Sequence, residues 1–271
     1  MPNETFGFAS VVRPCVDTLR PERIGLTATR SRPRLHYTES MRAAVFATIL
    51  LAIGSPLASA SDSELERARD KQDRPALDRI AAQYASGAQS APKDAEAQYR
   101  AALAASYNAE VALEVKDKEK ARRAAESGIA PAERAIAMKP ANGEYYRILA
   151  TLYGQVIPAN PMAGISYGKK AKEAIGKALE LSPKSAAVHM AEGVGNYYMP
   201  AMFGGGPELA ARNFREAIAL DSKNAESYLW LALAQKKLHK NAEARQSLTK
   251  SLELNPARVW AKDQLEKTPA Q

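Results

Sequence analysis

The stretch AESYLWLALAQKKLHKNAEARQSLTKSLELNP, residues 225–256, decides the fold of this chain. Apolar residues recur at helical spacing on both sides of the short polar segment His239-Lys240-Asn241, which predicts two helices joined by a tight turn. Ala232 and Ala244 fall where these helices would cross, and a small side chain at a crossing lets two helix axes approach closely. Pro256 cannot continue a helix interior and therefore ends the unit.

Tails like the end of this unit recur along the chain. They are Met138-Lys139-Pro140, Leu181-Ser182-Pro183, Leu220-Asp221-Ser222 and Leu254-Asn255-Pro256. The last two tails are 34 residues apart, and the frame of large and small positions also fits residues 142–183 and 186–222. The sequence therefore predicts an array of repeated helical hairpins.

The period and the residue frame resemble the tetratricopeptide repeat family over residues 95–256. The positions that carry the resemblance are Tyr146, Leu149, Ala150, Ala171, Gly193, Phe214, Tyr228, Ala232, Ala244 and Pro256. His189 stands where the family has an aromatic residue, which is a departure from its pattern. The resemblance implies an all-α fold, a right-handed superhelical solenoid of antiparallel helix pairs that ends in a capping helix.

The segments outside the clear repeats complete this architecture. Residues 61–93 are interpreted as a degenerate first helix pair, and residues 94–256 as the tetratricopeptide repeat domain. Residues 257–271 read as a capping helix and tail, because the end of a solenoid needs a unit with a polar outer face. The total is four to five hairpins and a cap.

Two repeats are longer than 34 residues, and both insertions fall between the first and second helix, at residues 154–162 and 199–206. Both insertions are unusually apolar, with Val156, Ile157, Met162, Met199, Met202 and Phe203, and Tyr197 and Tyr198 directly precede the second. Exposed apolar patches mark sites for partners or ligands, although such turns can also bury their own side chains. The run 204–206 lacks the Lys-Ser/Thr of a phosphate-binding loop and is interpreted as a glycine turn.

The family resemblance also implies that particular first-helix positions line a concave groove. With the two apolar turns, they give a predicted partner-binding set: Arg147, Thr151, Met190, Val194, Tyr197, Tyr198, Met202, Phe203, Leu229, Leu233 and Lys236. Some family members hold a peptide carboxylate with Lys and Asn, but this chain has Arg147 and Thr151 there, and Glu226 where a second Lys would be. An apolar or amphipathic segment suits this groove better. The alternative is that its apolar members pack as core.

The N-terminal region is predicted to direct export. Met41-Arg42, an apolar run over 43–53 and Ala58-Ser59-Ala60 have the three-part pattern of a signal peptide at residues 41–60, and the run is too short to span a membrane. The chain therefore resembles an exported bacterial repeat protein of the periplasm or the cell exterior. Residues 1–40 are interpreted as a gene-model extension or a disordered segment. Cys15 lies there, so the chain beyond residue 60 has no cysteine for a disulfide, a metal or a nucleophile.

No cofactor, metal or catalytic motif is expected, and the chain is predicted not to be an enzyme. His189 and His239 lie in different repeats and no hydrolase or dinucleotide fingerprint is present. The net charge is +8, of which residues 1–60 carry +3. In the rest of the chain Lys and acidic residues are interspersed along helices rather than clustered, so nucleic acid is not an expected partner. We expect a scaffold for a protein or peptide partner, with no membrane insertion after signal cleavage. The alternative is a periplasmic small-molecule or transport-associated carrier with a pocket at the two apolar turns.

Overall fold

The computed structural model describes residues 62–160, 162 and 164–270, so the segments interpreted as an extension and a signal peptide lie outside the described residues. The described part is helical and contains no strand. Its α-helices are α2 (Asp62–Asp70), α3 (Arg74–Ser90), α4 (Ala95–Glu114), α5 (Lys118–Met138), α6 (Gly143–Val156), α7 (Gly164–Leu181), α8 (Ala186–Tyr198), α9 (Pro207–Leu220), α10 (Ala225–Lys237), α11 (Asn241–Leu254) and α12 (Val259–Glu266). Two short 3-10 helices, η1 (Ile157–Ala159) and η3 (Ala201–Phe203), lie in the two long turns.

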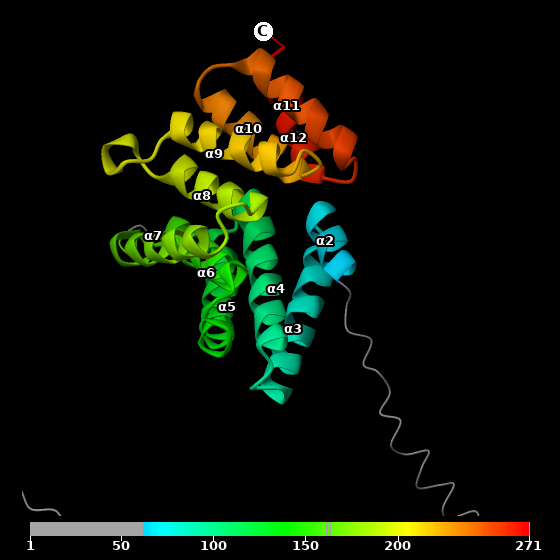
Figure 1. Ribbon diagram of the computed structural model, residues 1–271. Helices are drawn as coiled ribbons and strands as arrows, with labels where there is room; N and C mark the ends of the chain where they lie inside the picture. The colour runs from blue at the N-terminus through cyan, green and yellow to red at the C-terminus, as the bar shows by residue number, and fades with distance from the viewer. Residues whose placement is uncertain (1–61, 161, 163, 271) are drawn as a thin grey trace, which may run out of the picture. The chain divides into compact units, whose positions relative to one another are not determined.

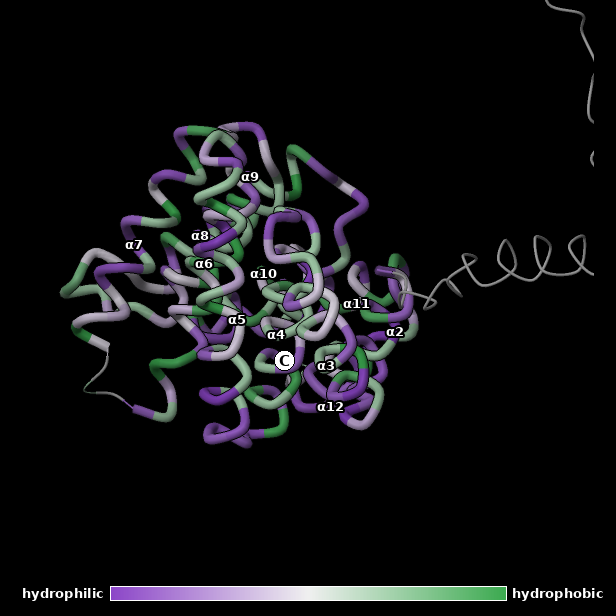
Figure 2. The backbone as a smooth tube through the Cα atoms, turned by 90° about the horizontal axis from the view of Figure 1, so that it is seen from below, coloured by the Kyte–Doolittle hydropathy of each residue, from purple (hydrophilic) through white to green (hydrophobic). Residues whose placement is uncertain are grey.

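Successive helices pack as hairpins. The pairs α4–α5, α6–α7, α8–α9 and α10–α11 make the most extensive helix–helix contacts, α2 and α3 form a shorter first pair, and α12 packs on α11 at the end of the array (Figure 1). Seen from below, α4, α6, α8 and α10 lie towards the middle, and α7, α9 and α11 lie farther out (Figure 2). The predicted all-α solenoid of helix pairs with a C-terminal capping helix is confirmed.

Polar side chains fix where six of these helices begin. In each case an Asp, Asn or Ser directly before the helix accepts a backbone N–H of the first turn: Asp73, Asp94, Asp117, Asn142, Ser185 and Asn224. A cap of this kind contributes about 1 kcal/mol by satisfying a donor that the helix itself leaves unpaired. The caps precede α3, α4, α5, α6, α8 and α10, whereas α9, α11 and α12 begin without a side-chain cap.

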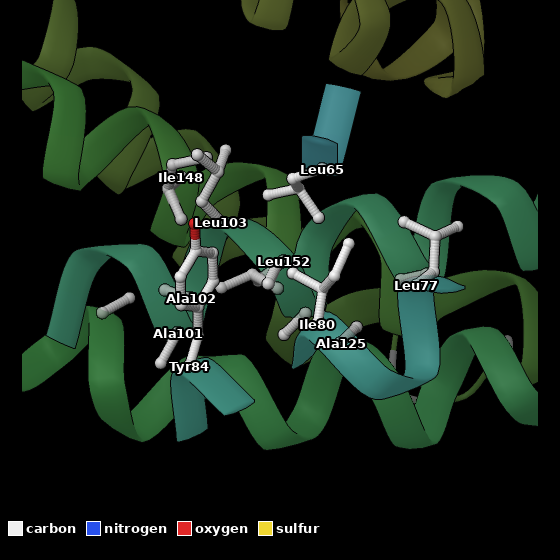
Figure 3. Close-up of a cluster of buried hydrophobic side chains, with 14 of the residues drawn as sticks. Leu65, Leu77, Ile80, Tyr84, Ala101, Ala102, Leu103, Ala125, Ile148 and Leu152 are labelled. Atoms are coloured by element: carbon white, nitrogen blue, oxygen red, sulfur yellow. The ribbon is translucent and has the colours of Figure 1, made fainter. Parts of the chain in front are cut away.

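Small side chains occupy the helix crossings. Ala102, Ala125, Ala210, Ala232 and Ala244 are all fully buried. In the N-terminal half these alanines pack with Leu65 of α2, Leu77 and Ile80 of α3, and the aliphatic side chains of α4 and α6 (Figure 3). The core of the N-terminal half is therefore formed mainly by alanine and aliphatic side chains of closely approaching helices.

No helix of the described residues combines the length and the apolar character needed to cross a membrane.

The close approach at Gly193 generates a prediction for α8. An added Cβ there would lie 2.5 Å from Cε1 of Phe214, which is itself fully buried in α9. We expect Gly193→Ala to lower the free energy of unfolding by about 1–3 kcal/mol, because either α8 or the Phe214 ring must move. Urea denaturation of the full chain measures this change.

Gly195 of the same helix provides the matched control. No atom lies within 4 Å of a Cβ built at this exposed position. Gly195→Ala should therefore raise the free energy of unfolding by about 0.5–1 kcal/mol through helix propensity. Equal effects of the two substitutions would show that the α8–α9 crossing tolerates a larger side chain.

Candidate functional site

The turn between α8 and α9 projects at the left of Figure 1, and three glycines shape it. Gly204 and Gly206 have φ angles of 86° and 113°, in the left-handed region that favours glycine. A Cβ on Gly205 would overlap the carbonyl oxygen of Met199. The Gly206 N–H donates to the Asn196 carbonyl oxygen at 2.8 Å, which closes the turn back onto α8. The glycine run thus has a structural role, and it leaves η3 facing outwards.

The turn between α6 and α7 is built differently. Val156 is buried at the end of α6 and Ile157 is half-buried, and η1 packs against α5, α6 and α7. This turn therefore covers part of its own apolar surface. Met162 and, at the start of α7, Ile165 stay exposed.

Large exposed apolar side chains concentrate at these two turns. Among the described residues, eight large hydrophobic side chains are exposed, and five of them belong to the turns or adjoin them: Met162, Ile165, Tyr198, Met202 and Phe203. These five are between 60% and 83% exposed, whereas Val115, Leu220 and Val259 elsewhere do not exceed 40%. We call the five residues the apolar edge.

An aromatic cluster anchors the edge to the C-terminal repeats. The Tyr198 and Tyr197 rings lie 6.1 and 5.7 Å from that of Trp230 in α10, and Trp230 lies 5.3 Å from Trp260 in α12. The Lys237 ammonium lies 3.6 Å from the Tyr197 ring centroid and donates to the Tyr197 carbonyl oxygen at 2.8 Å. Tyr198 is therefore presented from a rigid base.

The predicted groove residues do not form one continuous open surface. Leu229 and Leu233 are buried in the core that α10 shares with its neighbours, and Met190 and Val194 are half-buried against α9 and α10. Hydrogen bonds within the chain engage the polar members: Arg147 with Glu144, Thr151 with the Arg147 carbonyl oxygen, and Lys236 with Gln264. Of the predicted contact set, Tyr198, Met202 and Phe203 are the exposed side chains.

A buried charge cluster that no sequence pattern indicates is centred on Arg258, directly before α12. Its guanidinium is fully buried and binds Glu226 at 2.8 Å, Glu110 at 2.8 Å and Glu114 at 2.5 Å. Asp70 lies 3.9 Å away and accepts a hydrogen bond of 2.8 Å from Asn255. Arg69 pairs with Asp70 at 2.7 Å and lies 3.7 Å from Glu226. We call these charged groups, Arg69, Asp70, Glu110, Glu114, Glu226 and Arg258, the Arg258 cluster.

The cluster holds more acids than bases. Burial raises the pKa of Glu110 to about 7, an effect that Arg69 and Arg258 reduce and that Glu114 and Glu226 increase. Burial also raises the pKa of Glu114, whereas at Glu226 the two arginines outweigh burial and lower the pKa. Two arginines thus face four carboxylates, and Glu110 is the member that takes up a proton near neutral pH. Tyr107 and Tyr198 are also close enough to feel the charge of Glu110.

Neither histidine resembles a catalytic or metal-binding group in this structure. The His189 ring nitrogen lies 2.8 Å from the Pro183 carbonyl oxygen, and His239 occupies an exposed turn with φ of 59°. Within residues 62–160, 162 and 164–270, no group of three or more His, Cys, Asp and Glu side chains is placed to hold a metal ion.

Comparisons with known proteins agree with this architecture. The family model described as RMD1-3, Regulator of microtubule dynamics protein 1-3, matches residues 59–267. A search of curated proteins returned no match. Among solved structures, the chain is similar to TTC0263, a thermophilic TPR protein of Thermus thermophilus, with 19% identity and a TM-score of 0.54 over 76% of this chain and 97% of that one. It is also similar to the HusA haemophore from Porphyromonas gingivalis, with 17% identity and a TM-score of 0.54 over 68% and 96% of the two chains. These similarities confirm the tetratricopeptide fold.

The raised pKa of Glu110 predicts how stability depends on pH. The folded chain binds the Glu110 proton more tightly than the unfolded chain does. The contribution of this proton to the free energy of unfolding is therefore full at low pH and is lost as pH rises from about 4.5 to about 7. Glu110→Gln, which mimics the protonated acid, should therefore raise the free energy of unfolding at pH 8 by about 1–3 kcal/mol and leave it nearly unchanged at pH 5.

Urea denaturation at the two pH values measures the difference between variant and parent. Glu126→Gln, on the exposed ion pair with Arg122 at the surface of α5, is the control and should be nearly neutral at both. If the Glu110→Gln variant is less stable than the parent at pH 8, the ionised Glu110 carboxylate stabilises the fold more than a neutral side chain does, and the prediction is wrong.

Proposed function

The chain belongs to the RMD1-3 family (Regulator of microtubule dynamics protein 1-3), and we propose that it is an exported, non-catalytic repeat scaffold that binds another protein or peptide. The observation that carries this proposal is the apolar edge, because most large exposed hydrophobic side chains of the described residues gather at two turns. Leaving such side chains in water costs about 1.5–3 kcal/mol each relative to burial. A partner that covers them recovers this free energy.

The chemistry of the edge favours a protein surface as its occupant. Tyr198 combines an exposed ring with a hydroxyl, and aromatic residues of this kind often contribute most to protein interfaces. Its position is fixed by Trp230, so little conformational freedom is lost when a partner binds. Met202 and Phe203 extend the contact along η3. The partner is expected to present an apolar or amphipathic segment to this edge.

The concave face offers less exposed apolar surface to a partner than the apolar edge does. Leu229 and Leu233 are already buried, and Arg147 is held by Glu144 at 2.5 Å. The half-buried Met190 and Val194 lie on α8, the helix that leads into the second long turn. We therefore assign the first contact with a partner to the edge and a supporting role to Met190 and Val194.

A small-molecule carrier is the alternative function. A hollow of about 360 Å³ lies on α5, α6 and α7, lined by residues that include Glu133, Tyr153 and Lys170. None of its lining residues belongs to the apolar edge, and its mixed acidic and basic lining favours no single ligand class. This hollow supports the carrier less well than the edge supports a protein partner. One structural relative is described as a haemophore, which makes haem a suitable probe for the alternative.

Removal of the edge side chains tests the scaffold. We expect the double substitution Met202→Ser and Phe203→Ser to reduce capture of a specific protein from the cell-envelope fraction at least about tenfold. The reason is that the partner no longer buries these two exposed apolar side chains when it binds. Thermal unfolding should be unchanged because both side chains are exposed. Affinity capture followed by mass spectrometry is the measurement.

Leu220→Ser is the control, since Leu220 is an exposed apolar residue at the far end of α9. It should leave capture intact. Equal capture by the double variant would remove the edge from the interface. If neither form captures a protein while the full chain binds haem in an absorbance titration, the carrier alternative replaces the scaffold.

Export is part of the proposal and rests on the pattern of residues 41–60. We expect the full chain, expressed in a Gram-negative bacterium, to yield a periplasmic protein whose N-terminus is Ser61. Intact-mass spectrometry of the periplasmic extract checks this. Ala60→Arg should block cleavage and keep the protein in the membrane fraction. An intact chain that begins at Met1 or Met41 in the cytoplasm would disprove export.

A further inference from the structure

The described chain contains two separate sets of core residues. One core joins α2, α3, α4, α5 and α6, with Tyr167 and Ala171 of α7 packed against it. The other cores join residues from α8 to α12, around Phe214, Trp230 and Leu248. The division falls between α7 and α8. We call α2–α7 the N-terminal half and α8–α12 the C-terminal half.

The junction between the halves along the chain is thin. α8 packs on both α6 and α7, and this packing is less extensive than that of α6 on the α4–α5 pair. Only Ala174 and Ala178 are buried in α7, and only Val188 and Gly193 in α8. Fewer apolar contacts resist relative motion of two packed units. The α7–α8 seam therefore has the character of a hinge.

The Arg258 cluster forms the second junction between the same two halves. Arg69, Asp70, Glu110 and Glu114 come from α2 and α4, whereas Glu226, Asn255 and Arg258 come from the C-terminal half. Long side chains make these contacts, without the close helix packing that joins successive repeats. The cluster therefore links segments up to 189 residues apart in the sequence, as in the contact of Arg258 with the Arg69 carbonyl oxygen.

We propose that the Arg258 cluster is a latch that holds the two halves of the array closed, with the α7–α8 seam as its hinge. Burying ions costs desolvation that nearly offsets their attraction, so such a junction is close to balance. When Arg258 is absent, however, four carboxylates face Arg69 alone, and their repulsion favours separation of the halves. Opening parts α2 and α4 from the C-terminal half and exposes the charged side chains of the Arg258 cluster to water. The latch does not depend on which partner the chain binds.

A distance measurement across the two halves tests the latch. The full chain has one cysteine, Cys15, so a Cys15→Ser background accepts new spin-label pairs. Lys93→Cys with Lys262→Cys spans the halves, from the α3–α4 turn to α12, and both positions are exposed. Arg212→Cys with Lys262→Cys is the control pair and lies within the C-terminal half. Double electron–electron resonance reports both distances.

Arg258→Met should lengthen the distance across the halves and broaden its distribution about twofold, while the control pair stays unchanged. An unchanged distance across the halves, with native helix content by circular dichroism, would overturn the latch. If the control pair also broadens, Arg258 serves the fold of the C-terminal half, and the latch is again overturned.

Arg69→Gln provides a second break should Arg258→Met fail to fold. It removes the α2 cation that pairs with Asp70 at 2.7 Å and lies 3.7 Å from Glu226 of the C-terminal half. The latch then requires a longer or broader distance across the halves with an unchanged control pair. A native distribution in this variant would overturn the proposal.

Discussion

The close approach of helices through alanine and glycine is the constraint on which this structure depends. Gly128 illustrates it, because an added Cβ would lie 2.8 Å from Ala105 and 2.9 Å from Leu152. With so little space between axes, each hairpin can stack on the next and bury a continuous apolar surface despite few aromatic residues. Any change in length or side-chain volume within the helices would disturb a crossing. Variation is therefore tolerated mainly in the connections between them.

That constraint explains why the distinctive chemistry of this chain lies in its turns. Residues 154–156 of the first predicted insertion extend α6, whereas residues 157–162 and 199–206 lengthen the connections without shifting a crossing. The array can therefore carry apolar side chains in these connections at little cost to its packing. The glycines at 204–206 hold the second turn against α8 and so keep η3 out of the core. The exposed side chains of the apolar edge thus follow from the same packing rule that shapes the core.

The helix pairs are predictable from local sequence patterns. The contacts between α2, α4 and the C-terminal helices are not, because they join residues far apart in the sequence. Alternation of apolar and small residues, caps and proline-like tails all act within one repeat, so the sequence is sufficient to predict the hairpins and the capping helix. The same frame predicts that Leu229 and Leu233 line a groove, but α11 and α12 bury Leu229, and α9 buries Leu233. Tyr198 is the last residue of α8, Met202 and Phe203 lie in η3 of the following turn, and all three side chains are exposed.

Arg258 shows most clearly what periodicity cannot convey. Glu110 and Glu114 are spaced like any charged pair on a solvated helix, and Arg258 precedes a short terminal helix, so no local signal joins them. Their contact arises only from the curvature accumulated over the whole array. A surface of charges also suits a junction that opens and closes, because carboxylates and guanidinium groups are well hydrated when exposed. An apolar junction between the same helices would hold more tightly, yet in the open form it would expose an apolar surface that promotes aggregation.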